Sequence, residues 1–332
     1  MIAEPYPFLF TPVFVPSPQA GGLFLDYAAD SYGQLEQSPA EAWLLFDDGA
    51  RSSVVVNGPL AGMSLSELFK RFGDDLTGRD TSVDGSFPLF ARLLDVGTTQ
   101  PIQVHPDADP AASGTAPETN AKFWYSIDRE PGARITIGIS RQVTNQQILL
   151  HLNRPGFERL LQRYPARPGD SYLVPPGFVH SISAGNLILE IQQRLIDPLL
   201  LAPVAEGGTN VSHEEQQRAL ASINREARRN VRVSREAGTA THTRRIALTP
   251  NCPYFQIEEI RLHDHIFLRT RRESFHLIYA VRGSVTVRWE DLALELTNGM
   301  LCCIPATCGD YTIVCGDTPS ELLKIMPGPI TP

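Results

Sequence analysis

Apolar residues in this chain come mostly in short runs that are bounded by turn-forming residues. Runs of this kind occupy positions 42–46, 53–56, 135–139, 172–174 and 187–192. A short apolar run between Gly, Pro, Asn or Asp is typical of a β-strand. The pattern returns after residue 250, in YFQIEEIRL, FHLIYAVRG, SVTVRWEDLALEL, GMLCCIPA, DYTIVCG and LLKIM. It predicts a mainly β protein with two β units.

Helical patterns are fewer, and they begin at capping signals. Ser64 precedes Glu67 by three residues, and Thr144 precedes Gln147 by three. This spacing is that of a capping box, in which the first side chain caps the helix. We expect helical segments at about 64–75 and 144–164, with the second divided at Pro155 because proline lacks the amide hydrogen. The later half of that segment would be FERLLQRY, and a third helix is predicted at 212–226.

The length of the chain, 332 residues, fits about two domains. We predict a first barrel with its helical segments at 1–200 and a second, smaller barrel at 246–330. The segment between them, 201–245, is polar and charged, with few large apolar residues, and is interpreted as a connector.

Charge and cysteine content narrow the class of protein further. The formal net charge is −8, which argues against a nucleic-acid partner. The first residues lack the basic and apolar regions of a signal peptide, and no apolar stretch reaches the length of a membrane span. Five cysteines occur, an odd number without a CxxC pair. We therefore expect a cytoplasmic protein with reduced thiols and no membrane partner.

One motif near the end of the first β unit is typical of cupin barrels. Gly169 is followed after five residues by Pro175, then by Gly177, His180 and Asn186. Pro and Gly would turn the chain sharply at the mouth of a barrel. His180 would then begin a strand with its side chain directed inward.

The second β unit repeats part of this motif. Gly299 and Pro305 keep the five-residue gap, but Thr307 replaces the second glycine and Asp310 replaces the histidine. The chain is therefore predicted to contain two cupin (jelly-roll) barrels, of which the second lacks metal ligands.

The first unit offers candidate metal ligands. Gln103 and His105 are two residues apart, so both would face the same side of a strand. Together with His180 and a residue from 116–125, they could converge in one pocket. Two imidazoles and an oxygen donor suit zinc or a similar divalent ion.

Several segments resemble type I mannose-6-phosphate isomerases of the short bacterial form, along nearly the whole chain. They are FLFTPVF at 8–14, VNGPLAG at 56–62, LSEL at 65–68, FPLFARLLD at 87–95, IQVHPD at 102–107, WYSID at 124–128 and LEIQQ at 189–193.

The resemblance implies a zinc-dependent aldose–ketose isomerase that joins fructose 6-phosphate and mannose 6-phosphate through a cis-enediol. Its partner would be a small molecule, a phosphosugar or sugar. The oligomeric state is left open, with a homodimer as one possibility. The residues that the resemblance and the motifs assign are Gln103, His105, His180 and Glu118 to the metal, Lys122 to acid–base chemistry or stabilisation of the oxyanion, and Arg194 to the phosphate.

Three positions depart from the family's pattern. Lys122 stands where the family has a glutamate ligand, Asn120 where it has an active-site lysine, and Leu200 where it has an arginine. Two interpretations follow. In one, the chain is an isomerase with a rearranged site, in which Glu118 replaces the missing ligand. In the other, it is a non-catalytic cupin that binds a sugar or phosphosugar as a regulator or degenerate subunit. A further option is another sugar-modifying reaction in the same pocket.

Overall fold

The computed structural model describes residues 4–33, 35–81, 85–106, 120–140, 142–152, 154, 156–193, 197–202, 212–224, 231–235 and 242–328. These residues form two compact units, each assembled from separate stretches of the chain. Unit 1 takes Met1–Val15, Phe24–Leu93 and Glu236–Pro332, and unit 2 takes Pro16–Leu23 and Leu94–Arg235. The predicted division into a first barrel at 1–200, a connector at 201–245 and a second barrel at 246–330 stays a prediction.

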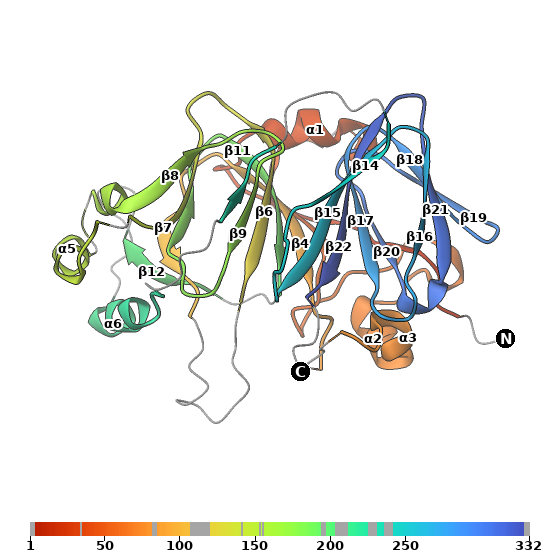
Figure 1. Cartoon of the computed structure of the whole chain (residues 1–332), viewed down its shortest axis with the longest axis horizontal. Coiled ribbons are helices and arrows are strands. Elements are labelled where there is room, and N and C mark those ends of the chain that lie inside the picture. Colours follow the sequence, from red (N-terminus) through yellow and green to blue (C-terminus); the bar gives the residue numbers. More distant parts are fainter. Residues whose placement is uncertain are drawn as a thin grey trace. The chain divides into compact units, whose positions relative to one another are not determined.

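Unit 1 contains two antiparallel sheets that are built mainly from the last third of the chain (Figure 1). The six-stranded sheet has the order β1 (Phe8–Leu9), β20 (Leu301–Ile304), β17 (His276–Arg282), β22 (Ser320–Pro327), β15 (Phe255–Leu262), β14 (Arg244–Ala247). The four-stranded sheet has the order β16 (His265–Arg269), β21 (Asp310–Cys315), β18 (Val285–Trp289), β19 (Leu292–Leu296).

The core of unit 1 joins these two sheets. Ile260 and Ile278 of the six-stranded sheet belong to one buried cluster with Val287 and Ile313 of the four-stranded sheet. Burial of such side chains is the main stabilising contribution to a two-sheet fold. The same unit holds β2 (Val13–Pro16), β3 (Pro39–Leu45), the 3-10 helices η1 (Gly58–Leu60) and η3 (Ala306–Cys308), and the helices α1 (Leu23–Tyr32), α2 (Leu65–Phe72) and α3 (Asp74–Thr77).

Unit 2 also contains two groups of paired strands. One sheet has the order β12 (Leu199–Ala202), β5 (Ile102–Val104), β10 (His180–Ile182), β7 (Arg134–Ile139), β8 (Leu161–Pro165). The other strands pair in the order β13 (Arg232–Val233), β9 (Ser171–Val174), β6 (Lys122–Arg129), β11 (Asn186–Gln192), β4 (Phe90–Val96), and β4 belongs to this unit from Leu94 onward.

A buried cluster connects the two groups of strands in unit 2. It includes Trp124 and Ile188 from one group and Ile135, Ile137 and Ile182 from the other. All seven residues of β11 are buried, so this strand has no solvent-facing side. The prediction of a mainly β protein is confirmed.

Three of the predicted helix starts are confirmed by their capping boxes. Ser64 caps α2, Thr144 caps α5 (Asn145–His151) and Ser212 caps α6 (His213–Ala221), each with a reciprocal bond from the residue three positions later. In Figure 1, α6 lies beside β12. Position 226, the predicted end of the third helix, lies outside the described residues.

Two predicted elements are wrong. The segment FERLLQRY is not a helix: Phe157–Leu160 form the 3-10 helix η2, and the chain then continues as β8. Pairing of β8 with β7 supplies the backbone hydrogen bonds that an α-helix would otherwise supply. The predicted strand at 53–56 contributes only isolated bridges, of Val54 with Ser64 and of Val55 with Phe10.

The five cysteines are free, and four of them are buried. Within the described ranges, no helix combines the length and the apolar character that crossing a bilayer requires.

Candidate functional site

The cupin motif of unit 2 positions His180 at the start of β10. Gly177 has a φ of 78°, and a Cβ there would lie 2.6 Å from Asn224 Cβ and 2.9 Å from its backbone nitrogen. Only glycine therefore fits without displacement of the neighbouring chain. The Gly177 amide donates a hydrogen bond to the carbonyl oxygen of His105, over 2.8 Å. The motif thus connects the segment before His180 with the residue that follows β5.

Two imidazole rings meet in the interior of unit 2. His105 and His180 stack with ring centroids 5.4 Å apart and an angle of 13° between their planes. Both side chains are buried, and His180 has no exposed surface. The prediction that these two histidines converge is therefore supported by direct geometry.

His180 has the protonation state of a metal ligand. Its Nδ1 lies 2.8 Å from the carbonyl oxygen of Phe178, and because that oxygen only accepts, Nδ1 carries the proton. Nε2 is buried and has no hydrogen-bond partner among the described residues. Burial and the positive charge of Lys122 lower the pKa of His180 to about 4. The ring is therefore neutral at pH 7, with a lone pair at Nε2.

A buried ion pair lies near the histidines. Lys122 Nζ is 3.3 Å from Glu190 Oε2, and the indole nitrogen of Trp124 donates to the same oxygen over 2.7 Å. The Lys122 and Glu190 side chains are only 5% and 2% exposed. Trp124 in turn packs edge-on against His180, with centroids 5.5 Å apart. The ammonium charge at the position of the family's glutamate is therefore offset by a carboxylate from β11.

Two glutamines lie on strands that pair with the strands of His180 and Lys122. Gln103 on β5 pairs with His180 in the sheet register and is half-buried. Gln192 on β11 pairs with Lys122, and both of its amide atoms are buried without a hydrogen-bond partner among the described residues. A buried unpaired amide is costly, so this position is suited to a bound ligand or water.

The remaining predicted site residues cannot be placed. Glu118 and Arg194 lie outside the described residues, in the segments 107–119 and 194–196. Over the part of the chain that the structure covers, no group of three or more His, Cys, Asp or Glu side chains is arranged to hold a metal. The described donors that fit a divalent metal are the two imidazoles, since His180 offers a neutral nitrogen with a free lone pair.

Glu190 and Gln192 are residues of this site that the sequence motifs did not predict. A signal for them is present in the strand NLILEIQ, where two polar residues at i and i+2 interrupt an otherwise apolar, fully buried run. Residues two apart on a strand share one face. A polar pair on one face of a fully buried strand therefore indicates a polar site inside the unit.

Comparisons with known proteins indicate the family to which the chain is similar. Residues 24–138 match the model of "Phosphomannose isomerase type I, catalytic domain". The protein named "Putative mannose-6-phosphate isomerase YvyI" from Bacillus subtilis (strain 168) is 29% identical over 312 residues, which are 92% of this chain and 95% of that protein. Mannose-6-phosphate isomerase ManA of the same strain is 33% identical over 191 residues, 56% of this chain and 58% of ManA.

Solved structures share the fold over almost the entire chain. The crystal structure of the mannose 6-phosphate isomerase from Bacillus subtilis has a TM-score of 0.76 and 25% identity, covering 97% of this chain and 99% of that one. A zinc-bound mannose 6-phosphate isomerase has a TM-score of 0.73 with 13% identity, covering 98% of this chain and 100% of the other, a likeness of fold alone. The cupin fold class is confirmed.

Proposed function

Because the chain belongs to the type I phosphomannose isomerase family, we propose that it interconverts fructose 6-phosphate and mannose 6-phosphate in the pocket of unit 2. The observation that carries this proposal is the neutral, buried His180, stacked on His105 and flanked by a buried ammonium group. Isomerisation of fructose 6-phosphate removes a proton from C1 and returns one to C2. The enediol between these two states requires a pocket that stabilises negative oxygen.

We assign the metal to His105 and His180, with Gln103 and Glu118 as further ligands. A bound zinc or similar ion would supply Lewis-acid stabilisation of the substrate oxygens. His180 is prepared for ligation because the Phe178 carbonyl holds the proton on Nδ1 and directs the lone pair of Nε2 away from that bond.

We assign to Lys122 the role of stabilising the substrate oxygen that becomes negative in the enediol. The Lys122–Glu190 contact holds the ammonium group in place, and Trp124 fixes the carboxylate by a second bond. Such a preorganised cation needs little rearrangement as charge develops on the substrate. Arg194 is assigned to the phosphate group, whose charge suits a guanidinium.

Metal content and turnover test this proposal together. We expect the full chain to bind one equivalent of zinc, measured by elemental analysis, and to convert fructose 6-phosphate in a coupled assay. His180→Gln should lose both, whereas His265→Gln, a change at an exposed histidine of unit 1, should lose neither. Lys122→Met should retain the metal and lower kcat by about 100-fold or more.

The outcomes separate the two interpretations of the sequence. Turnover with metal supports the isomerase. Stoichiometric metal with no turnover supports the alternative, a non-catalytic cupin that binds a sugar or phosphosugar. A wild-type chain without metal and without turnover contradicts the proposal.

A further inference from the structure

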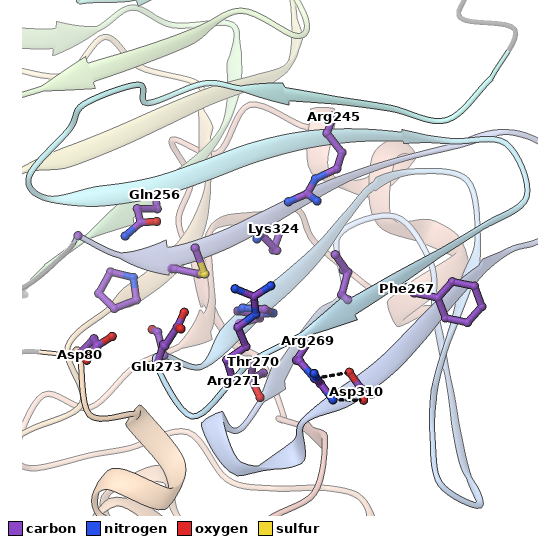
Figure 2. Close-up of a pocket in the computed structure, with 16 residues that line it drawn as sticks. Asp80, Arg245, Gln256, Phe267, Arg269, Thr270, Arg271, Glu273, Asp310 and Lys324 are labelled. Atoms are coloured by element: carbon purple, nitrogen blue, oxygen red, sulfur yellow. Dashed lines mark hydrogen bonds and ion pairs between the residues drawn. The ribbon is translucent and has the colours of Figure 1, made fainter.

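Unit 1 contains a cavity of about 460 Å³ that the proposed isomerase reaction does not use. Its lining includes four cationic residues, Arg245, Arg269, Arg271 and Lys324, together with the buried His276. Figure 2 shows Arg245 and Arg271 extending from opposite sides toward Lys324. A cavity of this volume accommodates a small metabolite.

The strand registers show that this cavity occupies the position in unit 1 that the histidine pocket occupies in unit 2. Both units carry the Gly-x5-Pro motif, and the residue before its proline is Val174 in unit 2 and Ile304 in unit 1. Val174 pairs with Lys122, and Ile304 pairs with His276. His276 is therefore the counterpart of Lys122.

A second pair of strands extends the correspondence. His180 pairs with Gln103 in unit 2, and Asp310, at the histidine position of the motif, pairs with Arg269 in unit 1. Arg269 is therefore the counterpart of Gln103. Arg271 follows it by two residues, as the histidine of the Q-x-H segment follows Gln103.

One buried position carries opposite charges in the two units. Glu190 pairs with Trp124, two residues after Lys122, and Lys324 pairs with Ile278, two residues after His276. The carboxylate of unit 2 is thus replaced by an ammonium group in unit 1. The positions of Gln103 and His105 in unit 2 thus correspond to Arg269 and Arg271 in unit 1, and cations are the groups that bind anions.

The cations of this cavity are not fully neutralised. Arg269 is paired with Asp310, but Arg245 and Lys324 share the single carboxylate of Glu258, at 2.6 and 3.2 Å. Over the described residues, no carboxylate forms an ion pair with Arg271, the fourth cation of the lining.

Positive charges near His276 add to the effect of burial on its pKa. Its pKa is lowered to about 3, first by burial and then by the positive charges of Lys324 and Arg245. Two carboxylates, Asp80 and Glu273, also line the cavity, and Figure 2 shows them together, apart from Arg245 and Lys324. One end of the cavity is therefore cationic, while the other offers acceptors for hydroxyl groups.

We propose that the cavity of unit 1 binds a small phosphate monoester that carries hydroxyl groups, such as a phosphorylated sugar. Arg245, Arg271 and Lys324 hold the phosphate, and Glu273 with Gln256 accepts and donates hydrogen bonds to the hydroxyl groups. The site is an effector or storage site for the ligand, since the counterparts of the two metal-ligating histidines are Arg271 and Asp310. It does not depend on the isomerase function of unit 2.

Calorimetric titration of the full chain with glucose 6-phosphate tests this site. Arg271 and Arg272 offer a matched pair, because both are exposed and both have positive φ, 55° and 59°, but only Arg271 lines the cavity. We expect Arg271→Gln to weaken one class of binding sites about tenfold, the effect of one charge-assisted hydrogen bond. Arg272→Gln should change the affinity less than about twofold.

Two further measurements complete the test. Arg245→Gln should weaken the same class of sites, and neutral glucose should bind far more weakly than glucose 6-phosphate. Thermal melts followed by circular dichroism verify that each variant is folded. The proposal is overturned if no class of sites responds to Arg271→Gln and Arg245→Gln in folded protein, or if glucose binds as tightly as its phosphate. Calorimetry measures binding and requires no turnover. The result for this cavity is therefore independent of whether the isomerase assay of unit 2 succeeds or fails.

Discussion

Lys122 and Glu190 are a pair of opposite charges inside unit 2, each almost completely removed from water. Loss of one partner of such a pair leaves the other charge buried and uncompensated, which costs more than the pair itself contributes. The Lys122 side chain therefore has a structural as well as a chemical role, and stability measurements can separate the two.

We predict that Lys122→Met lowers the free energy of unfolding of the metal-free chain by about 3 kcal/mol, measured by urea denaturation. Adding Glu190→Gln should restore most of that loss, because the neutral amide still accepts the hydrogen bond of Trp124. Lys70→Met, at an exposed position of α2, serves as the control and should change stability by less than about 0.5 kcal/mol. Equal losses in the single and double variants would contradict this account.

His276 makes the stability of the chain dependent on pH. Its folded-state pKa of about 3 lies below the usual value of 6.5, so between these values the unfolded chain binds the proton that the folded chain does not. Stability from this group is complete above pH 6.5 and decreases as the pH falls toward 3. Its contribution decreases by about 2 kcal/mol between pH 6.5 and 5.

Urea denaturation at several pH values should show this slope and its cause. His276→Gln removes the titrating group, and we expect its stability to decrease less steeply below pH 6.5 than that of the wild type. His265→Gln, at an exposed histidine, should keep the wild-type slope. If the slopes of the His276→Gln variant and the wild type coincide, His276 is not the group that titrates.

At the scale of elements, the turn before β10 requires Gly177 both for its backbone conformation and for its lack of a side chain. Gly177 has positive φ, and its missing Cβ leaves room for Asn224. Gly156 also has positive φ, 93°, but the nearest atom to its Cβ position is Arg159 Nε at 3.8 Å. The two glycines therefore separate backbone strain from steric overlap.

We predict that Gly156→Ala lowers the free energy of unfolding by about 1 kcal/mol, the cost of a left-handed non-glycine residue. Gly177→Ala should cost about 3 kcal/mol, since overlap with the packed chain adds to the same strain. It should also shift His180, the first residue of β10, which follows Gly177 by three positions. We expect this shift to weaken zinc binding. Chemical denaturation measures the first effect and metal titration the second; similar costs for both variants would argue against the overlap.

The elements also show what the sequence could predict and where it could not. Helices α2, α5 and α6 were predicted because Ser64, Thr144 and Ser212 begin them through local capping bonds. The 161–165 segment was predicted wrongly because its state is decided by pairing with β7, which is distant in sequence. Helix propensity is a local property, whereas strand pairing is a property of the fold.

The same distinction applies to the site. His105 and His180 could be predicted because each lies in a short motif with defined spacing. The contact of Lys122 with Glu190 joins residues that are 68 positions apart. No local pattern reports such a contact, so the residue that offsets the Lys122 charge could be identified only from the register of β6 with β11.

At the scale of the whole molecule, the net charge of −8 does not describe either pocket. The pocket of unit 2 balances Lys122 against Glu190, whereas the cavity of unit 1 collects four cations. A repeated strand arrangement therefore holds two different sets of charges, one suited to a metal and one to an anion.

Metal binding should stabilise the whole chain by mass action, because a site that requires folded strands is absent in the unfolded state. At a free zinc concentration 100 times the Kd, the free energy of unfolding should rise by about 2.7 kcal/mol, and EDTA should reverse the rise. The five cysteine thiols of the unfolded chain also bind zinc and reduce this shift.

A second titration with Mn²⁺, which prefers oxygen and nitrogen ligands to thiolates, limits that competition. With either metal, His180→Gln should lose the stabilisation, because the variant lacks one of the two imidazoles assigned to the metal, the one whose Nε2 lone pair is available. His265→Gln should retain it, since that ring lies at the surface and contacts Asp264. Equal stabilisation of all three proteins by Mn²⁺ would place the metal at a site other than the His105–His180 pocket.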